Sequence, residues 1–304
     1  MFNFKKEQKT FKIGNIEIGG KPGELPTVLI GTIFYEGHSI VSNAEEGIFD
    51  KAKAEELINK QEEFSEKTGC PSMIDIVGLT SNAMIKYIDF VSEKSNSPIL
   101  IDSSFPEIKI AGVKHCAEIG LLDRIVYNSI SHNVKNEELN ALKELGVKSA
   151  IILAFNPRDV RASGKLSLLI GEKGNGLLKK VEENGIEKPL IDVAILDVPS
   201  IGISLDAINL IKSETGLPCG GAPLNAVLEW KKVVELGDLA KNLCSGGSLI
   251  ALKCAGADFI LYGPIEKSKI VFPVAAMIDA IIAYRNRWYG IKPKTKNHPL
   301  YKIF

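Results

Sequence analysis

An alternation of short apolar runs with charged stretches constrains this chain more than any other feature of its sequence. The apolar runs are rich in β-branched residues and occupy residues 28–34, 73–78, 98–104, 124–130, 150–155, 189–195, 218–222 and 259–263. A strand that is covered on both faces reads as such a near-continuous run, whereas a half-exposed strand alternates apolar with polar residues. The sequence therefore predicts eight buried strands.

Between the apolar runs lie stretches with the spacing of amphipathic helices. They read KAKAEELINKQEEFSEKTG, SNAMIKYIDFVSEKS, EIKIAGVKHCAEIG, NEELNALKELG, NGLLKKVEENG, LDAINLIKSETG and LNAVLEWKKVVE. Several end on a glycine that the next strand follows at once, as many helices do. Eight β–α units predict an α/β fold, the closed (β/α)8 TIM barrel, with an open doubly wound sheet as the alternative.

Three segments fall outside this repeat in a chain that we interpret as one domain, residues 1–304. Residues 1–26 contain the alternating stretch FKIGNIEIGG, which predicts a short strand pair that closes the barrel floor. Residues 156–176 are long for a βα loop, and loops of this length are usually functional. Residues 285–304 carry several lysines around two prolines, which predicts an irregular arm or a contact between subunits.

The composition excludes several classes of function. The 37 basic residues balance the 37 acidic ones, which argues against a nucleic-acid partner because such proteins carry a basic surface. The five cysteines are scattered without CxxC spacing, as in reduced cytoplasmic proteins, and they suggest no metal site. No stretch is long and apolar enough to span a bilayer, so we expect a cytoplasmic chain without direct membrane insertion.

Polar residues stand where several of the predicted strands end: Asp75, Asp102, Asn128, Asp192 and Asn225. In a barrel, the carboxyl ends of all strands surround one cavity, where ligands bind. A ring of carboxylates and amides with few basic partners suits a neutral, flat ligand with many hydrogen-bond donors better than it suits a phosphate. Taken singly, the same residues are typical helix caps or loop anchors.

Longer strings along the chain carry a family resemblance. They read GTIFYEGHSIV, GIFDKAKAEELINKQEEFSEKTG, YIDFV, YNSI, KPLIDVAI and DFILYGPIE. These strings resemble the H-subunit family of tetrahydromethanopterin S-methyltransferase, whose bacterial relatives resemble methyltransferases acting between tetrahydrofolate and corrinoid proteins, including the methyltransferase II of glycine betaine and O-demethylase systems. More distantly, IDIVG, LIDSS, YNSIS, LIDVA and PLNAV are similar to the strand ends of methyltetrahydrofolate:corrinoid methyltransferases, a pterin-binding class that includes dihydropteroate synthase.

The resemblance implies a role for each strand-end residue. Asp75, Asp102, Asn128, Asp192 and Asn225 match the acids and amides of the family's strand ends and would bind the pterin. This agrees with the chemistry, because a reduced pterin presents amino and ring NH groups along one edge, which carboxylates and amides accept. Asn225 would also be the catalytic group, by donating a hydrogen bond to the pterin N5 when that nitrogen becomes a leaving group.

Three further residues are candidates for the site. Glu36 and His38 lie in the first predicted loop, and Ser129 follows Asn128. The acid at position 36 is a departure from the family's pattern, as is the DVPSIG stretch after the third predicted carboxylate. His38 reads equally as a contact to the corrinoid, as an acid–base group or as an ordinary turn histidine.

The resemblance implies methyl transfer between the cobalt of a corrinoid protein and N5 of a reduced pterin. Tetrahydrofolate is weakly favoured over tetrahydromethanopterin, and the corrinoid would be carried by a separate partner protein. We also expect a homodimer. Two alternatives remain open: a pterin-synthesis enzyme resembling dihydropteroate synthase, which would need lysine and arginine at strand ends for a pyrophosphate, and a non-catalytic barrel subunit of a membrane methyltransferase complex.

Overall fold

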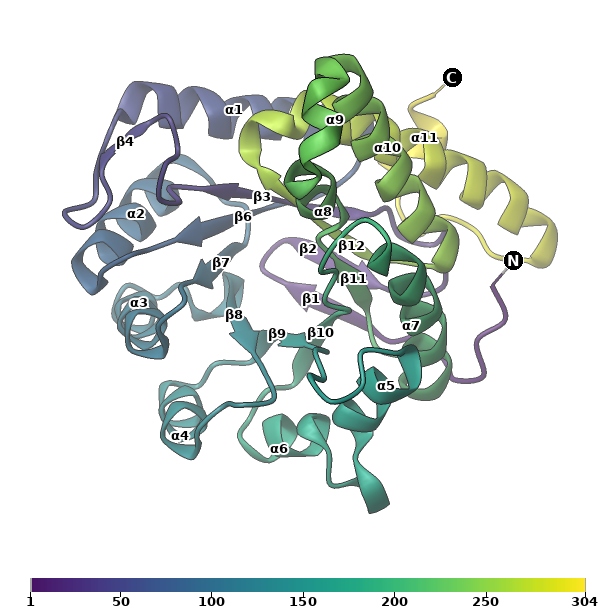
Figure 1. Ribbon diagram of the computed structural model, residues 1–304, viewed down its shortest axis with the longest axis horizontal. Coiled ribbons are helices and arrows are strands. Elements are labelled where there is room, and N and C mark those ends of the chain that lie inside the picture. Colours follow the sequence, from purple (N-terminus) through teal and green to yellow (C-terminus); the bar gives the residue numbers. More distant parts are fainter. Residues whose placement is uncertain (1, 304) are drawn as a thin grey trace.

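The computed structural model describes residues 2–303 and contains a closed barrel of eight parallel strands (Figure 1). These strands are β3 (Val28–Ile33), β6 (Ser72–Val77), β7 (Ile99–Asp102), β8 (Ile125–Ile130), β9 (Ser149–Leu153), β10 (Lys188–Asp192), β11 (Cys219–Gly221) and β12 (Phe259–Pro264). They pair in this order around the barrel, and β12 closes it by pairing with β3. The predicted barrel is therefore confirmed, and the open-sheet alternative is wrong.

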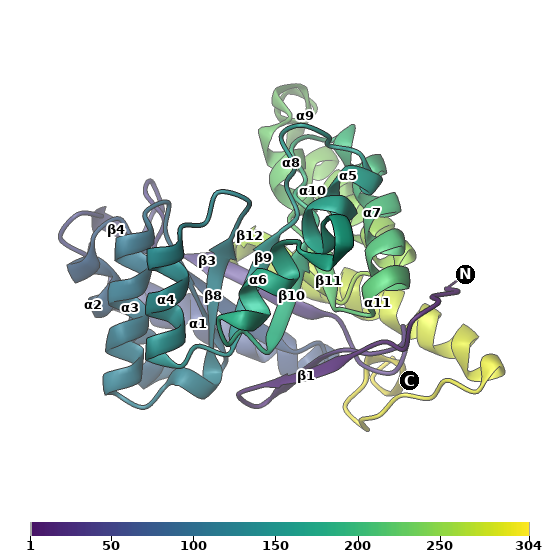
Figure 2. The same cartoon turned by 90° about the horizontal axis from the view of Figure 1, so that it is seen from below.

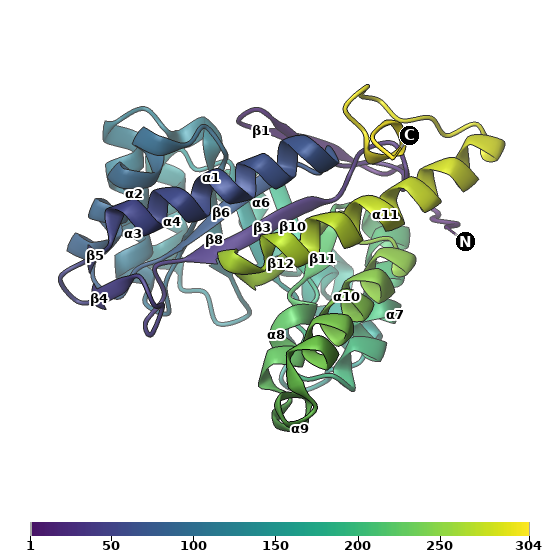
Figure 3. The same cartoon turned by 90° about the horizontal axis from the view of Figure 1, so that it is seen from above.

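Helices cover the outside of the barrel (Figures 1 and 3). They are α1 (Lys51–Thr68), α2 (Ser81–Lys94), α3 (Pro106–Glu118), α4 (Asn136–Leu145), α5 (Ala162–Ile170), α6 (Leu177–Glu183), α7 (Ser200–Thr215), α8 (Pro223–Glu229), α9 (Lys231–Glu235), α10 (Gly237–Ala255) and α11 (Ser268–Asn286). Helix α1 illustrates how their ends are fixed. The Asp50 side chain accepts a hydrogen bond from the Lys53 backbone N–H at 3.1 Å, and the helix stops at Gly69, whose φ of 77° suits glycine.

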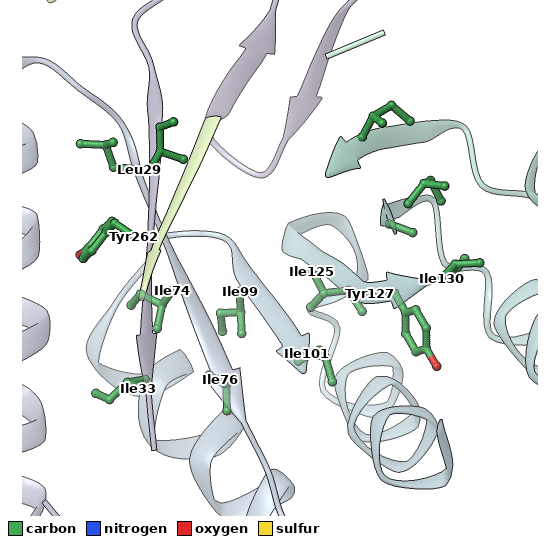
Figure 4. Close-up of a cluster of buried hydrophobic side chains, with 14 of the residues drawn as sticks. Leu29, Ile33, Ile74, Ile76, Ile99, Ile101, Ile125, Tyr127, Ile130 and Tyr262 are labelled. Atoms are coloured by element: carbon green, nitrogen blue, oxygen red, sulfur yellow. The ribbon is translucent and has the colours of Figure 1, made fainter. Parts of the chain in front are cut away.

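Each strand has apolar side chains on both faces because consecutive residues point to opposite sides. The outward side chains, among them Leu29, Ile74 and Ile101, pack against the helices and form the main core (Figure 4). The inward side chains, among them Val28 and Leu100, form a second cluster inside the barrel. This double burial explains the continuous apolar runs in the sequence.

A β-hairpin closes one end of the barrel. Strands β1 (Thr10–Ile13) and β2 (Ile16–Gly19) pair antiparallel. The side chains of Ile13, Ile16 and Ile18 are buried and belong to the same cluster as the inward side chains of the barrel strands. Figures 2 and 3 show this hairpin at the end of the barrel opposite to α8 and α9.

The structure corrects three expectations about the connections. Residues 156–176 are more than a long loop, because they contain α5 and a short 3-10 helix, Glu172–Gly174. The stretch LNAVLEWKKVVE is divided into α8 and α9, since the backbone is extended at Trp230 with φ −76° and ψ 93°. The long helices α10 and α11 were not among the predicted helical stretches.

A small hairpin of β4 (Val41–Asn43) and β5 (Ile48–Phe49) follows β3, and two short 3-10 helices, Arg287–Tyr289 and Pro299–Tyr301, follow α11.

Candidate functional site

The candidate site is the layer of side chains directly above the apolar interior of the barrel. Residues i and i+2 of a strand face the same side, so the residue two positions after an inward-facing apolar side chain also faces inward. This step leads from Ile30 to Thr32, from Met73 to Asp75, from Leu100 to Asp102, from Val126 to Asn128 and from Leu190 to Asp192. Four of the five predicted site residues therefore lie in one polar layer at the carboxyl ends of the strands.

Asp75 is the centre of this layer. Its Oδ2 accepts a hydrogen bond from Thr32 Oγ1 at 2.9 Å, and its Oδ1 accepts one from Asn128 Nδ2 at 3.1 Å. Thr32 is its register partner on β3, whereas Asn128 lies on β8, beyond β7. The intervening strand β7 contributes Asp102, which is in register with Asn128. The structure thus brings together three of the predicted residues and adds a threonine that was not predicted.

The carboxyl groups of this layer have pKa values above the ordinary range of aspartic acid. Burial raises the pKa of Asp75 to about 6, against the hydrogen bonds from Asn128 and Thr32, which lower it. Burial and the nearby Asp75 carboxylate together raise the pKa of Asp102 well above its usual range. Burial also raises the pKa of Asp192 to about 6. Clusters of carboxyl groups with raised pKa values are typical of binding and catalytic sites.

A buried lysine stands behind the Asp102 side of the layer. Lys109 of α3 is 5% exposed, and its Nζ donates a hydrogen bond to the Ser129 carbonyl at 2.9 Å. The same Nζ lies 4.3 Å from the centre of the Tyr127 ring and 3.8 Å from Glu138 Oε1. Its charge lowers the pKa of Asp102 and so opposes the effect of burial. Lys109 therefore supports both the backbone beside Asn128 and the ionised form of Asp102.

A second buried lysine stands behind Asp192 in the same way. Lys165 of α5 is 3% exposed, and its Nζ donates hydrogen bonds to the carbonyls of Val193 and Ala194. The Asp192 Oδ1 accepts a hydrogen bond from the Ala194 backbone N–H at 2.8 Å. The charge of Lys165 lowers the pKa of Asp192. Neither lysine was predicted from the sequence as part of the site, although each occupies the phase of its helix that is otherwise apolar or small.

Asn225 lies in the first turn of α8, on the same rim but without a hydrogen bond to the other four predicted residues. Its side chain is exposed, and its Oδ1 lies against the backbone of Gly263 on β12. A Cβ at position 263 would come within 2.6 Å of this oxygen. Gly263 also has a φ of 71°, which L side chains rarely adopt. Glycine is therefore required at this position if Asn225 is to lie where it does.

The three further candidates have different surroundings. Glu36 is exposed and lines a small rim pocket of about 170 Å³ with residues that follow β6 and β7. His38 is buried, and its Nδ1 accepts a hydrogen bond from the Phe34 N–H at 3.2 Å. The other ring nitrogen therefore carries the proton and donates to Glu266 Oε1 at 2.7 Å. Both ring nitrogens of His38 are thus hydrogen-bonded within the protein, and they connect the loop after β3 to the segment after β12. Ser129 contributes its carbonyl to the hydrogen bond with Lys109.

The arrangement presents hydrogen-bond acceptors around the mouth of the barrel at the carboxyl ends of its strands, which we call the bowl. Three carboxylates and two amides face or border it, and the two buried lysines lie behind the carboxylates with their ammonium groups bonded to backbone carbonyls. Such a bowl suits a flat, uncharged molecule with several N–H donors. Residues 2–303 contain no cluster of three or more His, Cys, Asp or Glu side chains that could hold a metal ion. Over the same residues, no helix has the length and apolar character needed to cross a membrane.

Comparisons with known proteins identify relatives over the whole length of the chain. The family described as tetrahydromethanopterin S-methyltransferase MtrH subunit matches residues 6–294. The chain is 43% identical over 311 residues to the H subunit of tetrahydromethanopterin S-methyltransferase from Methanopyrus kandleri, with 97% of each chain covered. It is 41% identical to the protein of the same name from Methanothermobacter thermautotrophicus, with 100% of each covered. The H subunit of the putative methyltransferase mtx from Methanosarcina mazei is also 41% identical, with 99% of each covered.

Among solved structures, the barrel is similar to dihydropteroate synthases. The Yersinia pestis enzyme with a pterine-sulfa conjugate has a TM-score of 0.62 and covers 90% of this chain and 98% of its own, at 12% sequence identity. The Coxiella burnetii enzyme in complex with pteroic acid has a TM-score of 0.58 at 14% identity, with 89% of this chain and 99% of its own covered. At these identities the likeness concerns the fold alone.

Proposed function

We propose, from the premise that the chain belongs to the family of tetrahydromethanopterin S-methyltransferase MtrH subunits, that it moves a methyl group between N5 of a reduced pterin and the cobalt of a corrinoid carried by a partner protein. The members of this family are named as methyltransferase subunits, so the chain is a methyltransferase of the same kind. We further propose that it acts in the cytoplasm as a single barrel domain.

The observation that carries the proposal is the acceptor-rich bowl around Asp75. The 2-amino and ring NH groups of a reduced pterin lie along one edge and need acceptors, which Asp75, Asp102 and Asp192 offer. Buried carboxylates are costly unless a ligand or the protein satisfies them with hydrogen bonds. A ligand that donates several hydrogen bonds would therefore offset the cost of burial that the raised pKa values indicate.

In the proposed reaction the residues of the chain bind and orient the pterin. The carboxylates hold its donor edge at the bottom of the bowl, while Asn128 and Asn225 offer both donors and acceptors. Asn225 would donate its amide N–H toward N5 and stabilise the charge that changes there during transfer. The corrinoid supplies the cobalt that gives or takes the methyl group, and that chemistry belongs to the cofactor. The chain supplies proximity, which can contribute on the order of 7–11 kcal/mol to a bimolecular step.

The identity of the pterin is the next part of the proposal. Two of the relatives are named for tetrahydromethanopterin, whereas the weak preference for tetrahydrofolate has only the distant resemblance behind it. Calorimetric titration of the purified chain with each reduced pterin decides between the two. The ring system that binds more tightly, with weaker binding after Asp102→Asn, is the substrate.

The reaction itself is tested by following the corrinoid spectrum. The purified chain is mixed with a methylated corrinoid protein and each reduced pterin, and loss of the methyl–cobalt absorption is recorded. We expect Asp75→Asn and Asp102→Asn to weaken pterin binding about 10- to 100-fold, because each replaces a charged acceptor by a neutral amide and turns one of its two acceptor oxygens into a donor. The exposed Asp123→Asn serves as the control that leaves transfer unchanged.

Two other outcomes would replace the proposal. Pterin binding without any spectral change, together with formation of a bond between a pterin and an aminobenzoate-type amine, would favour the synthase alternative. The absence of pterin binding would favour a non-catalytic role within a methyltransferase complex.

A further inference from the structure

The backbone makes a left-handed turn directly after β10, whose last residue is Asp192. The turn is at Ala194, which has a φ of 53°, a conformation that L side chains rarely adopt. Relative to an ordinary conformation, it lowers the population of alanine by a factor of about 5 to 30. The Ala194 N–H donates the 2.8 Å hydrogen bond to Asp192 Oδ1. The direction of this carboxylate therefore depends on a turn that alanine does not favour by itself.

Lys165 holds the turn from the side of α5. Its side chain is buried, and its Nζ donates hydrogen bonds to the carbonyls of Val193 and Ala194, the latter at 3.1 Å. These carbonyls belong to the two peptide groups that flank the Ala194 Cα. One ammonium group thus fixes both backbone angles of that residue. An apolar side chain could not replace it, because both carbonyls would lose their hydrogen-bond partner.

Helix α5 is fixed in a position from which Lys165 reaches the turn. The Asn156 side chain, in the loop after β9, donates a hydrogen bond to the Gly164 carbonyl at 3.0 Å. Gly164 also packs tightly on the same loop, since a Cβ at position 164 would come within 2.2 Å of the Asp159 carbonyl oxygen. The loop after β9 therefore holds the residue that directly precedes the lysine.

We propose that Lys165 is a positioning residue for methyl transfer: by holding the left-handed turn at Ala194, it keeps the Asp192 carboxylate directed toward the pterin. The inference rests on the proposed function for the identity of the ligand. The Ala194 N–H occupies Asp192 Oδ1, and within residues 2–303 no other group donates a hydrogen bond to this carboxylate. Oδ2 is thus left as an acceptor for a donor on the pterin. With its Nζ bonded to the two carbonyls, Lys165 acts on the ligand through Asp192.

The position of the carboxylate can be measured separately from its charge. Burial raises the pKa of Asp192 to about 6, against the Ala194 N–H and the charge of Lys165, which lower it. In the described part of the chain, Lys165 is the one charged side chain that shifts this pKa. Well above this value, near pH 8, the wild-type carboxyl group is ionised. Affinity in that range therefore reports where the carboxylate points.

The test is a rescue experiment by calorimetric titration near pH 8, with tetrahydrofolate and tetrahydromethanopterin as ligands of the full chain. Lys165→Met should weaken pterin binding about 10-fold, by the population that the turn loses. Adding Ala194→Gly should return the affinity to within about threefold of the wild type, because glycine adopts a positive φ without help. The matched control is Lys180→Met on α6. Its Nζ donates to the Val134 carbonyl at 3.2 Å, and the change should leave the affinity as it is.

A second measurement needs no pterin. Hydrogen exchange of the amide at position 194 reports its bond to Asp192 Oδ1 directly. Exchange should be about 10-fold faster in Lys165→Met and should return toward the wild-type rate when Ala194→Gly is added. If Lys165→Met folds poorly, Ala194→Val tests the same turn with the lysine in place. A β-branched residue is more strained at positive φ, so exchange should again be faster.

The two measurements distinguish failure of this inference from failure of the proposed function. Wild-type exchange at position 194 in Lys165→Met overturns the inference whether or not a pterin binds. Pterin affinity that Lys165→Met leaves unchanged, or that Ala194→Gly does not restore, overturns it as well. Faster exchange in a chain that binds neither pterin overturns the proposed function, and with it the role of the lysine in pterin binding.

Discussion

Replacing Asp75 by asparagine should stabilise the fold while weakening the site. Asp75 is 3% exposed, and burial raises its pKa from 3.8 to about 6. The folded chain therefore binds this proton more tightly than the unfolded chain does. The contribution of Asp75 to the free energy of unfolding is then highest at low pH, falls as the pH rises from about 4 to about 6, and stays low above that window. A shift of about two pKa units corresponds to about 3 kcal/mol.

Asparagine has the shape of the protonated acid but cannot ionise. Asp75→Asn should therefore raise the free energy of unfolding by about 3 kcal/mol near pH 8 and by almost nothing near pH 4. The neighbouring Asp102 acts in the same direction, since the Asp75 charge is one of the causes of its raised pKa. At the same time the variant should lose pterin affinity, because a charged acceptor has gone.

Urea unfolding followed by circular dichroism measures the stability at a series of pH values, and calorimetric titration measures the affinity. The control is Asp123→Asn, an exposed carboxyl group for which we expect a change in stability below about 0.5 kcal/mol at every pH. A variant that is equally or less stable than the wild type near pH 8 would refute the reasoning. A stabilisation that does not depend on pH would refute it as well, because the gain would then have another source.

Two other substitutions test residues that position or charge the side chains of the site. Gly263→Ala places a Cβ 2.6 Å from Asn225 Oδ1. Because the added atom displaces Asn225, the variant should slow methyl transfer at least about tenfold. Gly120→Ala is the control, since its φ of 76° is also positive but nothing lies within 4 Å of the added atom. Equal effects on the transfer rate would show that backbone strain alone is responsible. Lys109→Met removes a charge that lowers the pKa of Asp102. Asp102 of the variant should therefore become protonated at a higher pH, and pterin binding should be lost at a higher pH than in the wild type as the solution is acidified. An unchanged dependence of affinity on pH would contradict this.

The sequence predicted the barrel and the polar ends of its strands for one physical reason. Strands buried on both faces leave long apolar runs, so that a polar residue such as Asp75 or Asp192 stands out where a run ends. The two-residue period of a strand then places these side chains on the inward face.

The supporting residues could not be found in this way. Lys109 reaches the strand ends from a helix, and the turn of that helix about its own axis depends on packing that a single sequence does not specify. Lys165 was missed because residues 156–176 were interpreted as a loop, whereas they contain α5. The division of the α8–α9 stretch at Trp230 was missed for a related reason, since every residue around it is compatible with a helix. Thr32 was overlooked because a threonine within an apolar run is common in strands.

The hairpin beneath the barrel has a kinetic consequence. Because Ile13, Ile16 and Ile18 seal the interior from below, a molecule can enter and leave the bowl only from above. The pterin, which would bind deepest, must then arrive before the corrinoid protein covers the entrance, and it departs only after that protein has left. Steady-state kinetics of the proposed transfer should accordingly follow a compulsory order, with the pterin as the first substrate on and the last product off.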